Sequence, residues 1–343
     1  MRLIIDVMSG DAPCREAVGG AFQALDKLSV DITLVGDRDQ ILSAVESLGR
    51  KEDEIKIEHA ESVITMEDDY LAVIKSKKDS SMSKGLSLLR DGEGDAFISS
   101  GNTGALVTGA TLILRRIKGV RAACIAATIP IGKPMLLVDS GANVEPDAQS
   151  MHQFATMGSV YVKNMMGIDS PTVALINNGT ERTKGNKLVR ETFELLENDE
   201  NINFIGNIEG RDVVNSVCDV LVADGYTGNI ILKMVEGFGK FMSKTLKSIL
   251  FKNLKTKFAA LFLASDAKKL KKSMDYTEYG GAPLLGVAKP VIKAHGNSNA
   301  KAMFSACRQA KIFVETEICR EITEIAENWR RNKKSEEETN AEE

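Results

Sequence analysis

The chain repeats one local pattern, in which a short apolar segment ends in a turn and a segment of helical length follows. In the N-terminal part, residues 3–6, 32–37 and 55–60 have the composition of strands, and residues 16–28 and 41–48 that of helices. Strands that alternate with helices pair in parallel and carry helices on both faces of the sheet. The sequence therefore predicts an α/β fold with a mostly parallel sheet in a three-layer α/β/α arrangement.

The functional prediction depends most on residues 99–105, which have the sequence SSGNTGA. They follow a short apolar segment and precede the apolar residues 106–114, so a strand, a turn and a helix succeed one another. This arrangement points backbone N–H groups and the positive end of a helix dipole at one place, which favours an anion. A purely structural role of the glycines is an equally weighted alternative. The substrate-binding residues predicted here are Ser100, Gly101, Asn102, Thr103 and Gly104.

Three more predicted strands, at residues 135–139, 172–176 and 220–223, end in turns rich in Gly, Asn, Ser and Thr. Ligands of open α/β sheets bind at the carboxyl ends of the strands, so these turns predict one polar cleft with many small donors. Residues 291–296 add a last strand that ends in a basic turn. The further candidates for substrate binding are Asp6, Asn143, Asn186, Asp224, Thr227 and Lys293, and the candidates for catalysis are Lys184, Asn229 and His295. Asp11, just past the first strand, is at least as compatible with a helix cap as with a ligand.

Charge and cysteine usage exclude several classes of function. The 44 basic and 48 acidic residues give a net charge of −4, which argues against bulk nucleic-acid binding. The five cysteines show no C-x-x-C spacing and the three histidines are scattered, so we expect reduced thiols in a cytosolic protein, with no metal and no cofactor. The chain begins with a strand and not with a signal peptide, and it has no apolar run long enough to span a bilayer.

The predicted cleft lacks the motifs of a protein nucleophile or a nucleotide site. There is no G-x-S-x-G, no Walker-type loop and no G-x-G-x-x-G. Anion-binding turns, amides and lysines without a nucleophile suit a reaction in which a substrate anion attacks directly, such as phosphate on a thioester carbonyl. In that reaction we expect Lys184 to act on phosphate and His295 to donate a proton to the departing thiolate. A structural, hydrogen-bonded histidine is the alternative for His295.

The segment at about residues 238–274 is predicted to be a protruding amphipathic helical arm. Its lysines are accompanied by one acid between residues 244 and 272, and its apolar residues recur at three- and four-residue steps. A helix docked on the core is the usual explanation of such a stripe, but a membrane surface explains both the stripe and the lysines. The predicted membrane residues are Phe251, Leu254, Phe258, Leu261 and Phe262.

The remaining C-terminal segments complete the predicted organisation. Residues 276–286 are expected to be a Gly- and Pro-punctuated loop, residues 300–328 a closing helix, and residues 331–343 a charged, flexible tail. Residues 1–330 are expected to form a single catalytic domain that carries the arm.

Several motifs together resemble the bacterial phosphate acyltransferases, in family order and over nearly the whole chain. They are KDSSM at 78–82, SGNTGA at 100–105, GAN at 141–143, KGN at 184–186, FIGNIEGRD at 204–212, DGYTGN at 224–229, EYGGAPLLG at 278–286 and KAHG at 293–296. At the N-terminus the family usually has DAMGGD, and residues 6–11 read DVMSGD. Ser9 therefore replaces a glycine, and this replacement would disturb the turn if the turn requires a positive φ at this position.

The resemblance implies reversible transfer of a fatty acyl group from acyl carrier protein to inorganic phosphate, without a covalent acyl-enzyme. It also implies a homodimer with a core similar to phosphate acetyltransferases and to isocitrate and isopropylmalate dehydrogenases. The acyl phosphate would pass to a membrane glycerol-3-phosphate acyltransferase in phospholipid synthesis, and the protein would associate peripherally with the inner face of the cell membrane. The alternatives are a phosphate acetyl- or butyryltransferase that uses coenzyme A, and a non-catalytic scaffold at the membrane surface.

Overall fold

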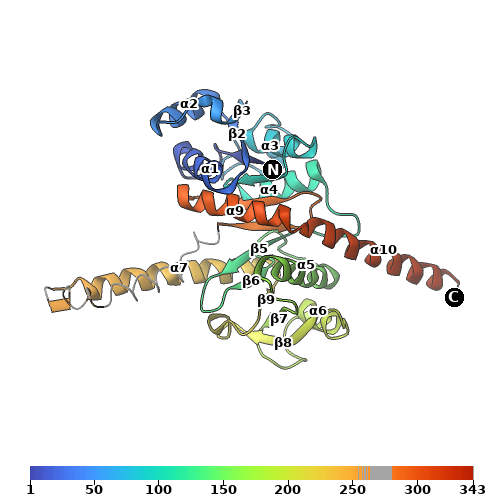
Figure 1. The fold of residues 1–343 in the computed structure, drawn as a ribbon. Coiled ribbons are helices and arrows are strands. Elements are labelled where there is room, and N and C mark those ends of the chain that lie inside the picture. Colours follow the sequence, from blue (N-terminus) through green and yellow to red (C-terminus); the bar gives the residue numbers. More distant parts are fainter. Residues whose placement is uncertain (254, 257, 259, 261, 263–279, 343) are drawn as a thin grey trace.

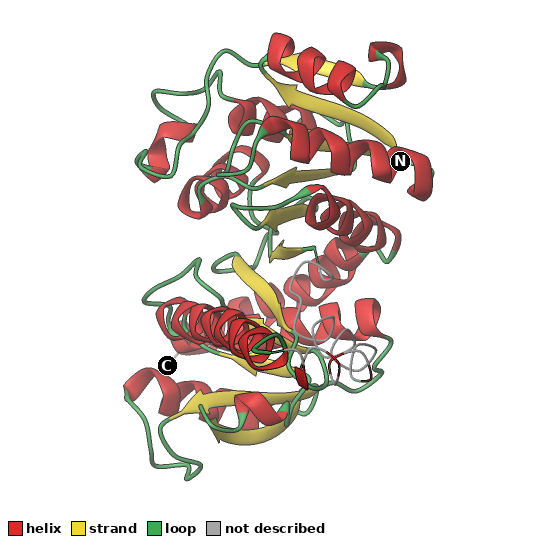
Figure 2. Ribbon diagram, turned by 90° about the vertical axis from the view of Figure 1, so that its left-hand side faces the viewer, coloured by secondary structure: helices red, strands yellow, loops and turns green. Residues whose placement is uncertain are grey.

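The protein forms a single mixed sheet with helices on both faces, as the sequence predicts (Figures 1 and 2). The structure is a computed structural model that describes residues 1–253, 255, 256, 258, 260, 262 and 280–342, with side chains up to residue 331. Over these residues the sheet has eleven strands in the order β3-β2-β1-β4-β11-β10-β5-β6-β9-β7-β8. Their bounds are β1 Arg2–Asp6, β2 Asp31–Gly36, β3 Lys56–His59, β4 Ala96–Ser99, β5 Cys124–Ile129, β6 Met135–Val138, β7 Thr172–Asn177, β8 Asn203–Glu209, β9 Val220–Val222, β10 Gly281–Leu285 and β11 Val291–Ala294.

The strands are parallel except around the middle of the sheet. β10 runs antiparallel to both β11 and β5, and β5 runs antiparallel to β6. The helices are α1 Cys14–Leu28, α2 Arg38–Ser47, α3 Ser81–Arg90, α4 Thr103–Gly109, α5 Ala148–Met166, α6 Lys187–Glu197, α7 Gly225–Leu250, α9 Ala300–Glu315 and α10 Ile318–Glu342. α4 continues into a π-helical turn at Ala110–Leu114.

Alternating side chains divide the core into two layers, one on each face of the sheet. In β1, Leu3 and Ile5 pack with residues of α1 and α9, whereas Ile4 packs with residues of α3 and α4. In the C-terminal half, Val173 of β7 faces the α5 and α6 side and Ala174 faces the α7 side. Because successive side chains of a strand point to opposite faces, both layers are buried, and inner strands such as β4 and β6 are buried along their whole length.

Three local predictions from the sequence are wrong. The expected loop at 276–286 contains β10, whose residues 281–283 pair with β11 and whose residues 284–285 pair with β5. The helix expected from residue 238 begins at Gly225, because Asp224 caps it by accepting from the Thr227 N–H at 2.9 Å. The expected closing helix at 300–328 is two helices, which are separated at Thr316 and Glu317.

Two long helices extend away from the body, α7 on one side and α10 on the other (Figure 1). Beyond the last residue of α7, Leu250, the side chains of Phe251, Phe258 and Phe262 are exposed by 55%, 65% and 76%. Leu254 and Leu261 of the predicted stripe lie outside the described residues. The backbone of α10 continues as a helix to Glu342, into the segment for which the sequence predicts a flexible tail. Within the described residues, no helix has the length and apolarity needed to cross a membrane.

Candidate functional site

A pocket of about 400 Å³ lies where the middle of the sheet meets α7. Its polar and charged lining includes Asp11 after β1, Thr103 of α4, Ser140 after β6, Asn229, Lys233 and Glu236 of α7, and Lys293 and His295 at the end of β11. Its apolar lining includes Met66, Ile125, Ala127 and Leu232. The pocket therefore joins a cluster of charged groups to an apolar wall.

The N-terminal half of α7 lies directly against the turn that follows β6. A Cβ atom added at Gly228 would meet the Asp139 carbonyl oxygen at 2.0 Å, and one added at Gly225 would meet the Asn143 carbonyl oxygen at 2.5 Å. No side chain fits at these distances, so the two glycines allow the helix to approach. The same contact brings Asn229 next to Gly141, which adopts φ +137°.

The turn after β6 is organised by a buried carboxylate. Asp139 is fully buried and accepts hydrogen bonds from the backbone N–H groups of Ile125, Gly141, Ala142 and Asn143. The Asn143 side-chain amide donates to Asp139 Oδ2 at 2.9 Å and to the Ala123 carbonyl at 2.7 Å. Burial raises the pKa of Asp139, and these donors oppose that rise. Asn143 therefore holds the turn, and Ser140 and Gly141 face the pocket.

Glu236 contacts a lysine and a histidine at one side of the pocket. Its Oε2 lies 3.0 Å from Lys233 Nζ and 3.7 Å from His295 Nε2. Burial disfavours the Glu236 carboxylate, but the His295 and Lys233 contacts outweigh burial and lower its pKa to about 2. The Asn297 N–H donates to His295 Nδ1 at 3.2 Å, which fixes the ring hydrogen on Nε2, the atom that faces Glu236.

Lys293 lines the pocket from the end of β11. Its Nζ donates to the Ser100 carbonyl at 3.2 Å and to the Ala294 carbonyl at 2.6 Å. Burial and the nearby Lys233 ammonium lower its pKa to about 8, against the opposite effect of Asp11 and Asp6.

The turn at residues 99–105 has mainly internal hydrogen bonds. Asp6 is buried and accepts from the Ser99 hydroxyl at 2.8 Å, and the Ser100 hydroxyl donates to the Ser9 carbonyl at 2.6 Å. Gly101 is buried, and a Cβ atom there would meet Ser9 Cβ at 2.6 Å. The turn at 6–11 tolerates Ser9, because the positive φ of +102° falls on Gly10. Of the five residues predicted from this turn, Thr103 lines the pocket.

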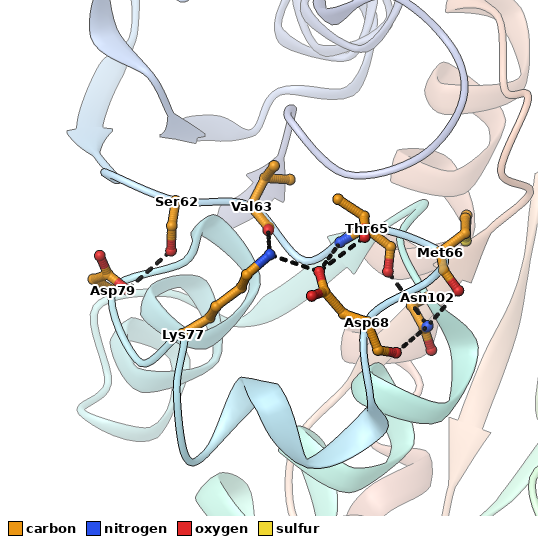
Figure 3. A network of polar contacts seen from close by, with 8 residues as sticks. All are labelled: Ser62, Val63, Thr65, Met66, Asp68, Lys77, Asp79 and Asn102. Atoms are coloured by element: carbon orange, nitrogen blue, oxygen red, sulfur yellow. Dashed lines mark hydrogen bonds and ion pairs between the residues drawn. The ribbon is translucent and has the colours of Figure 1, made fainter.

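Asn102 ties the turn to the loop that passes over it (Figure 3). Its Oδ1 accepts from the Ala105 N–H at 3.0 Å and caps α4, while its Nδ2 faces three carbonyl oxygens of the loop at 3.2–3.4 Å. Lys77 Nζ donates to the Val63 carbonyl at 2.9 Å and to Asp68 Oδ2 at 2.7 Å in the same loop. The hydrogen bond from Lys77 is the main reason that the pKa of Asp68 is lowered to about 2. This network holds the loop that carries Met66 to the pocket wall.

Other predicted residues lie at a second pocket, of about 320 Å³, beside the start of α7. Asn186, Asp224 and Thr227 line it, and the first two are also the N-caps of α6 and α7. Lys184 is exposed on the loop before Asn186 and is not among the lining residues of either pocket. The structure therefore brings Thr103, Asn229, Lys293 and His295 together and leaves Lys184 apart from them.

Lys233 and Glu236 are pocket residues that the sequence analysis missed. They are spaced with Asn229 at steps of four and three residues, which places all three on one helical face. The sequence could have indicated this shared face only if the helix had been predicted to begin at residue 225. Within the described part of the chain, no group of three or more His, Cys, Asp or Glu side chains is placed to hold a metal ion.

Comparisons with known proteins agree with the fold. Residues 1–321 match the family described as "Fatty acid synthesis protein". A phosphotransacetylase from Streptococcus pyogenes aligns with a TM-score of 0.60 at 15% identity, over 91% of this chain and 94% of that one. A 4-hydroxythreonine-4-phosphate dehydrogenase from Klebsiella pneumoniae aligns with a TM-score of 0.55 at 11% identity, over 91% and 99%. At these identities the two structures show a shared fold.

Sequence relatives define the family more narrowly. A protein named phosphate acyltransferase from Caldanaerobacter subterraneus subsp. tengcongensis is 46% identical over 329 residues, which are 95% of this chain and 98% of the relative. A protein of the same name from Oceanobacillus iheyensis is 43% identical over 330 residues, or 96% and 98%. With identity at this level over nearly the full length, the chain belongs to the phosphate acyltransferase family and is an acyltransferase.

Proposed function

We propose that the protein transfers a fatty acyl group reversibly from the thioester of acyl carrier protein to inorganic phosphate, with the reaction in the 400 Å³ pocket. The observation that carries the proposal is that one pocket is lined both by Lys233, Lys293 and His295 and by an apolar wall. Cations suit a phosphate dianion, and the wall formed by Met66, Ile125 and Leu232 suits the first carbons of an acyl chain.

The lining favours direct attack by phosphate. The described residues that line the pocket include no cysteine, and the hydroxyl of Ser140 donates to the Ile125 carbonyl at 3.0 Å. Phosphate held beside Lys233 and Lys293 would attack the thioester carbonyl carbon. The negative charge that develops on the carbonyl oxygen would be met by the donors of Asn229 and Thr103, and the C–S bond would then break.

The assay mixes the protein with palmitoyl-acyl-carrier protein and phosphate and traps acyl phosphate as its hydroxamate. We expect phosphate-dependent product, and less product from palmitoyl-coenzyme A. Faster turnover of a short-chain coenzyme A thioester would favour the acetyl- or butyryltransferase alternative, and no product from any thioester would favour a scaffold. The predicted role of Lys184 is tested in the same assay, because Lys184→Met should raise the Michaelis constant for phosphate if Lys184 binds it.

The exposed face of α7 supports a homodimer. Tyr226, Ile230, Met234, Phe238 and Phe241 recur at steps of three and four residues and are each exposed by 49–73%. Such a continuous apolar stripe on a helix is typical of an interaction surface. We propose that two copies of the chain pair through this face. Light scattering should then give a dimer for the wild type and a monomer for Met234→Glu, and a dimeric variant would contradict the pairing.

The distal arm supports association with an anionic membrane. Phe258 and Phe262 are exposed, and the lysines at 244, 247, 252 and 255 are exposed near them. Each lysine close to an anionic surface adds on the order of 1 kcal/mol, which salt screens. We propose that membrane association through the arm leads to release of acyl phosphate beside a membrane glycerol-3-phosphate acyltransferase. Phe258→Glu with Phe262→Glu should abolish sedimentation with anionic liposomes and leave acyl phosphate formation nearly intact, and continued sedimentation would contradict the proposal.

A further inference from the structure

The ammonium group of Lys293 is held at the pocket with one hydrogen left over. Two of its three N–H hydrogens are used by the Ser100 and Ala294 carbonyl oxygens, at 3.2 and 2.6 Å. Both acceptors are backbone atoms: Ser100 follows β4 directly, and Ala294 lies in β11 beside Lys293 itself. Because β4 and β11 are paired at Ser99 and Lys293, the sheet fixes the position of Nζ. The third hydrogen is available to a ligand in the pocket that Lys293 lines.

The charges around Lys293 come from three elements. Asp6 at the end of β1 and Asp11 in the following turn favour the ammonium, and Lys233 of α7 disfavours it. Asp6 is already engaged by the Ser99 hydroxyl and by the backbone N–H groups of Met8 and Ser9. Burial and Lys233 outweigh the two carboxylates, so the pKa of Lys293 falls to about 8. A thiol of ordinary pKa, about 8.5, is closely matched to such a donor.

His295, the proton donor that the sequence predicts, is engaged at both ring nitrogens. Its Nδ1 accepts the Asn297 N–H at 3.2 Å, and its Nε2 hydrogen faces the ionised Glu236 at 3.7 Å. Both ring nitrogens of His295 therefore face groups of the protein, whereas the third N–H hydrogen of Lys293 can be donated to a ligand.

We propose that Lys293 protonates the departing sulfur, with Lys233 as the positioning residue that tunes it and Glu236 as the residue that holds Lys233. The proposal rests on the proposed transfer to phosphate. An oxygen of monohydrogen phosphate forms the new C–O bond, the C–S electron pair goes to sulfur, and sulfur takes a proton from Lys293 Nζ. Lys293 then recovers a proton from the P–OH group, so the products are acyl phosphate and a thiol with no net gain or loss of protons.

The first test compares two leaving groups with Lys293→Met. The substrates are palmitoyl-acyl-carrier protein, whose thiol is an alkyl thiol, and palmitoyl thiophenyl ester, whose thiol is more acidic and needs no proton to depart. We expect turnover of the alkyl thioester to fall roughly 10²–10⁴-fold, and that of the aryl thioester to fall less than about tenfold. Equal losses on both substrates would overturn the proposal, because they would assign Lys293 to binding. Failure of the wild type to form acyl phosphate from either ester would instead refute the proposed function.

The second test remains decisive if Lys293→Met does not fold. Turnover divided by the Michaelis constant of the thioester is measured against pH with saturating phosphate. The wild type should lose activity above about pH 8 as Lys293 loses its proton. In Lys233→Met the pKa of Lys293 should rise, so this limb should move to higher pH. Lys240→Met, exposed on the same helix, is the matched control and should leave the limb in place. An unmoved limb in Lys233→Met would overturn the proposal.

Discussion

The sequence and the structure suggest different roles for Asn102, a substrate contact and a structural contact. A substitution at this position distinguishes the two roles. The sequence predicts a substrate contact, whereas the side chain caps α4 and faces three loop carbonyls (Figure 3). Loss of an Asn cap costs about 0.5–2 kcal/mol. Loss of the long, shared contacts of Nδ2 costs about as much as one ordinary hydrogen bond, roughly 0.5–1.5 kcal/mol.

Asn102→Ala should therefore destabilise the protein by about 2 kcal/mol. With an unfolding entropy of about 2.1 cal/mol/K per residue, a chain of 343 residues should lose about 3 °C in melting temperature. Asn102→Ser keeps a capping oxygen and should recover roughly half of that loss. The Michaelis constant for phosphate should stay within about twofold of the wild type, while that for the acyl thioester should rise, because the loop that carries Met66 loosens.

Differential scanning calorimetry gives the stability, and the hydroxamate assay with varied phosphate gives the Michaelis constant. The reasoning is refuted if Asn102→Ala raises the Michaelis constant for phosphate tenfold or more at an unchanged melting temperature. That result would make Asn102 a substrate contact, as the sequence predicts.

Three further outcomes follow from close contacts and charges. Gly228→Ala should lower the free energy of unfolding by about 1–3 kcal/mol and remove most of the activity, because the new Cβ would lie 2.0 Å from the Asp139 carbonyl oxygen. Gly237→Ala on the same helix is the control: its Cβ meets nothing within 4 Å, so the substitution should be neutral or slightly stabilising. The folded-state pKa of Glu236, about 2, is below its unfolded value of about 4.3, so its stabilisation is present above that value and is lost as pH falls towards 2. Acid titration followed by circular dichroism should show less loss of stability over this range in Glu236→Gln than in the wild type.

The strands that the sequence predicts well are those buried on both faces. Residues 3–5 and 135–138 are continuous apolar runs, and the structure confirms both as parts of strands, of which β1 is parallel to both of its neighbours and β6 is parallel to β9. β10 could not be predicted in the same way, because Pro283 and the glycines at 280, 281 and 286 in and beside it are typical of a loop. The strand forms because its two ends pair with different neighbours, a long-range arrangement that local composition does not contain.

The unexpected start of α7 explains why two charged residues of the pocket, Lys233 and Glu236, were missed. Glycines at positions 225 and 228 predict a turn, because glycine disfavours helices. In the structure both lie in the helix, where the absence of a side chain allows contact with the turn after β6. Because the helix was expected only from residue 238, Lys233 and Glu236 were not placed on a helix, and their position on the same face as Asn229 was not predicted. Lys293 and His295 were found because they lie together in the basic turn of the last strand.

Direct attack of phosphate on the thioester is the step on which the proposed function depends. The most direct measurement mixes a high concentration of the protein with palmitoyl-acyl-carrier protein and follows thiol release by rapid quenching, with and without phosphate. If phosphate attacks directly, there should be no burst of thiol when phosphate is absent, and one acyl phosphate for each thiol released when it is present. A burst of thiol that equals the enzyme concentration in the absence of phosphate would reveal an acyl-enzyme and contradict the account.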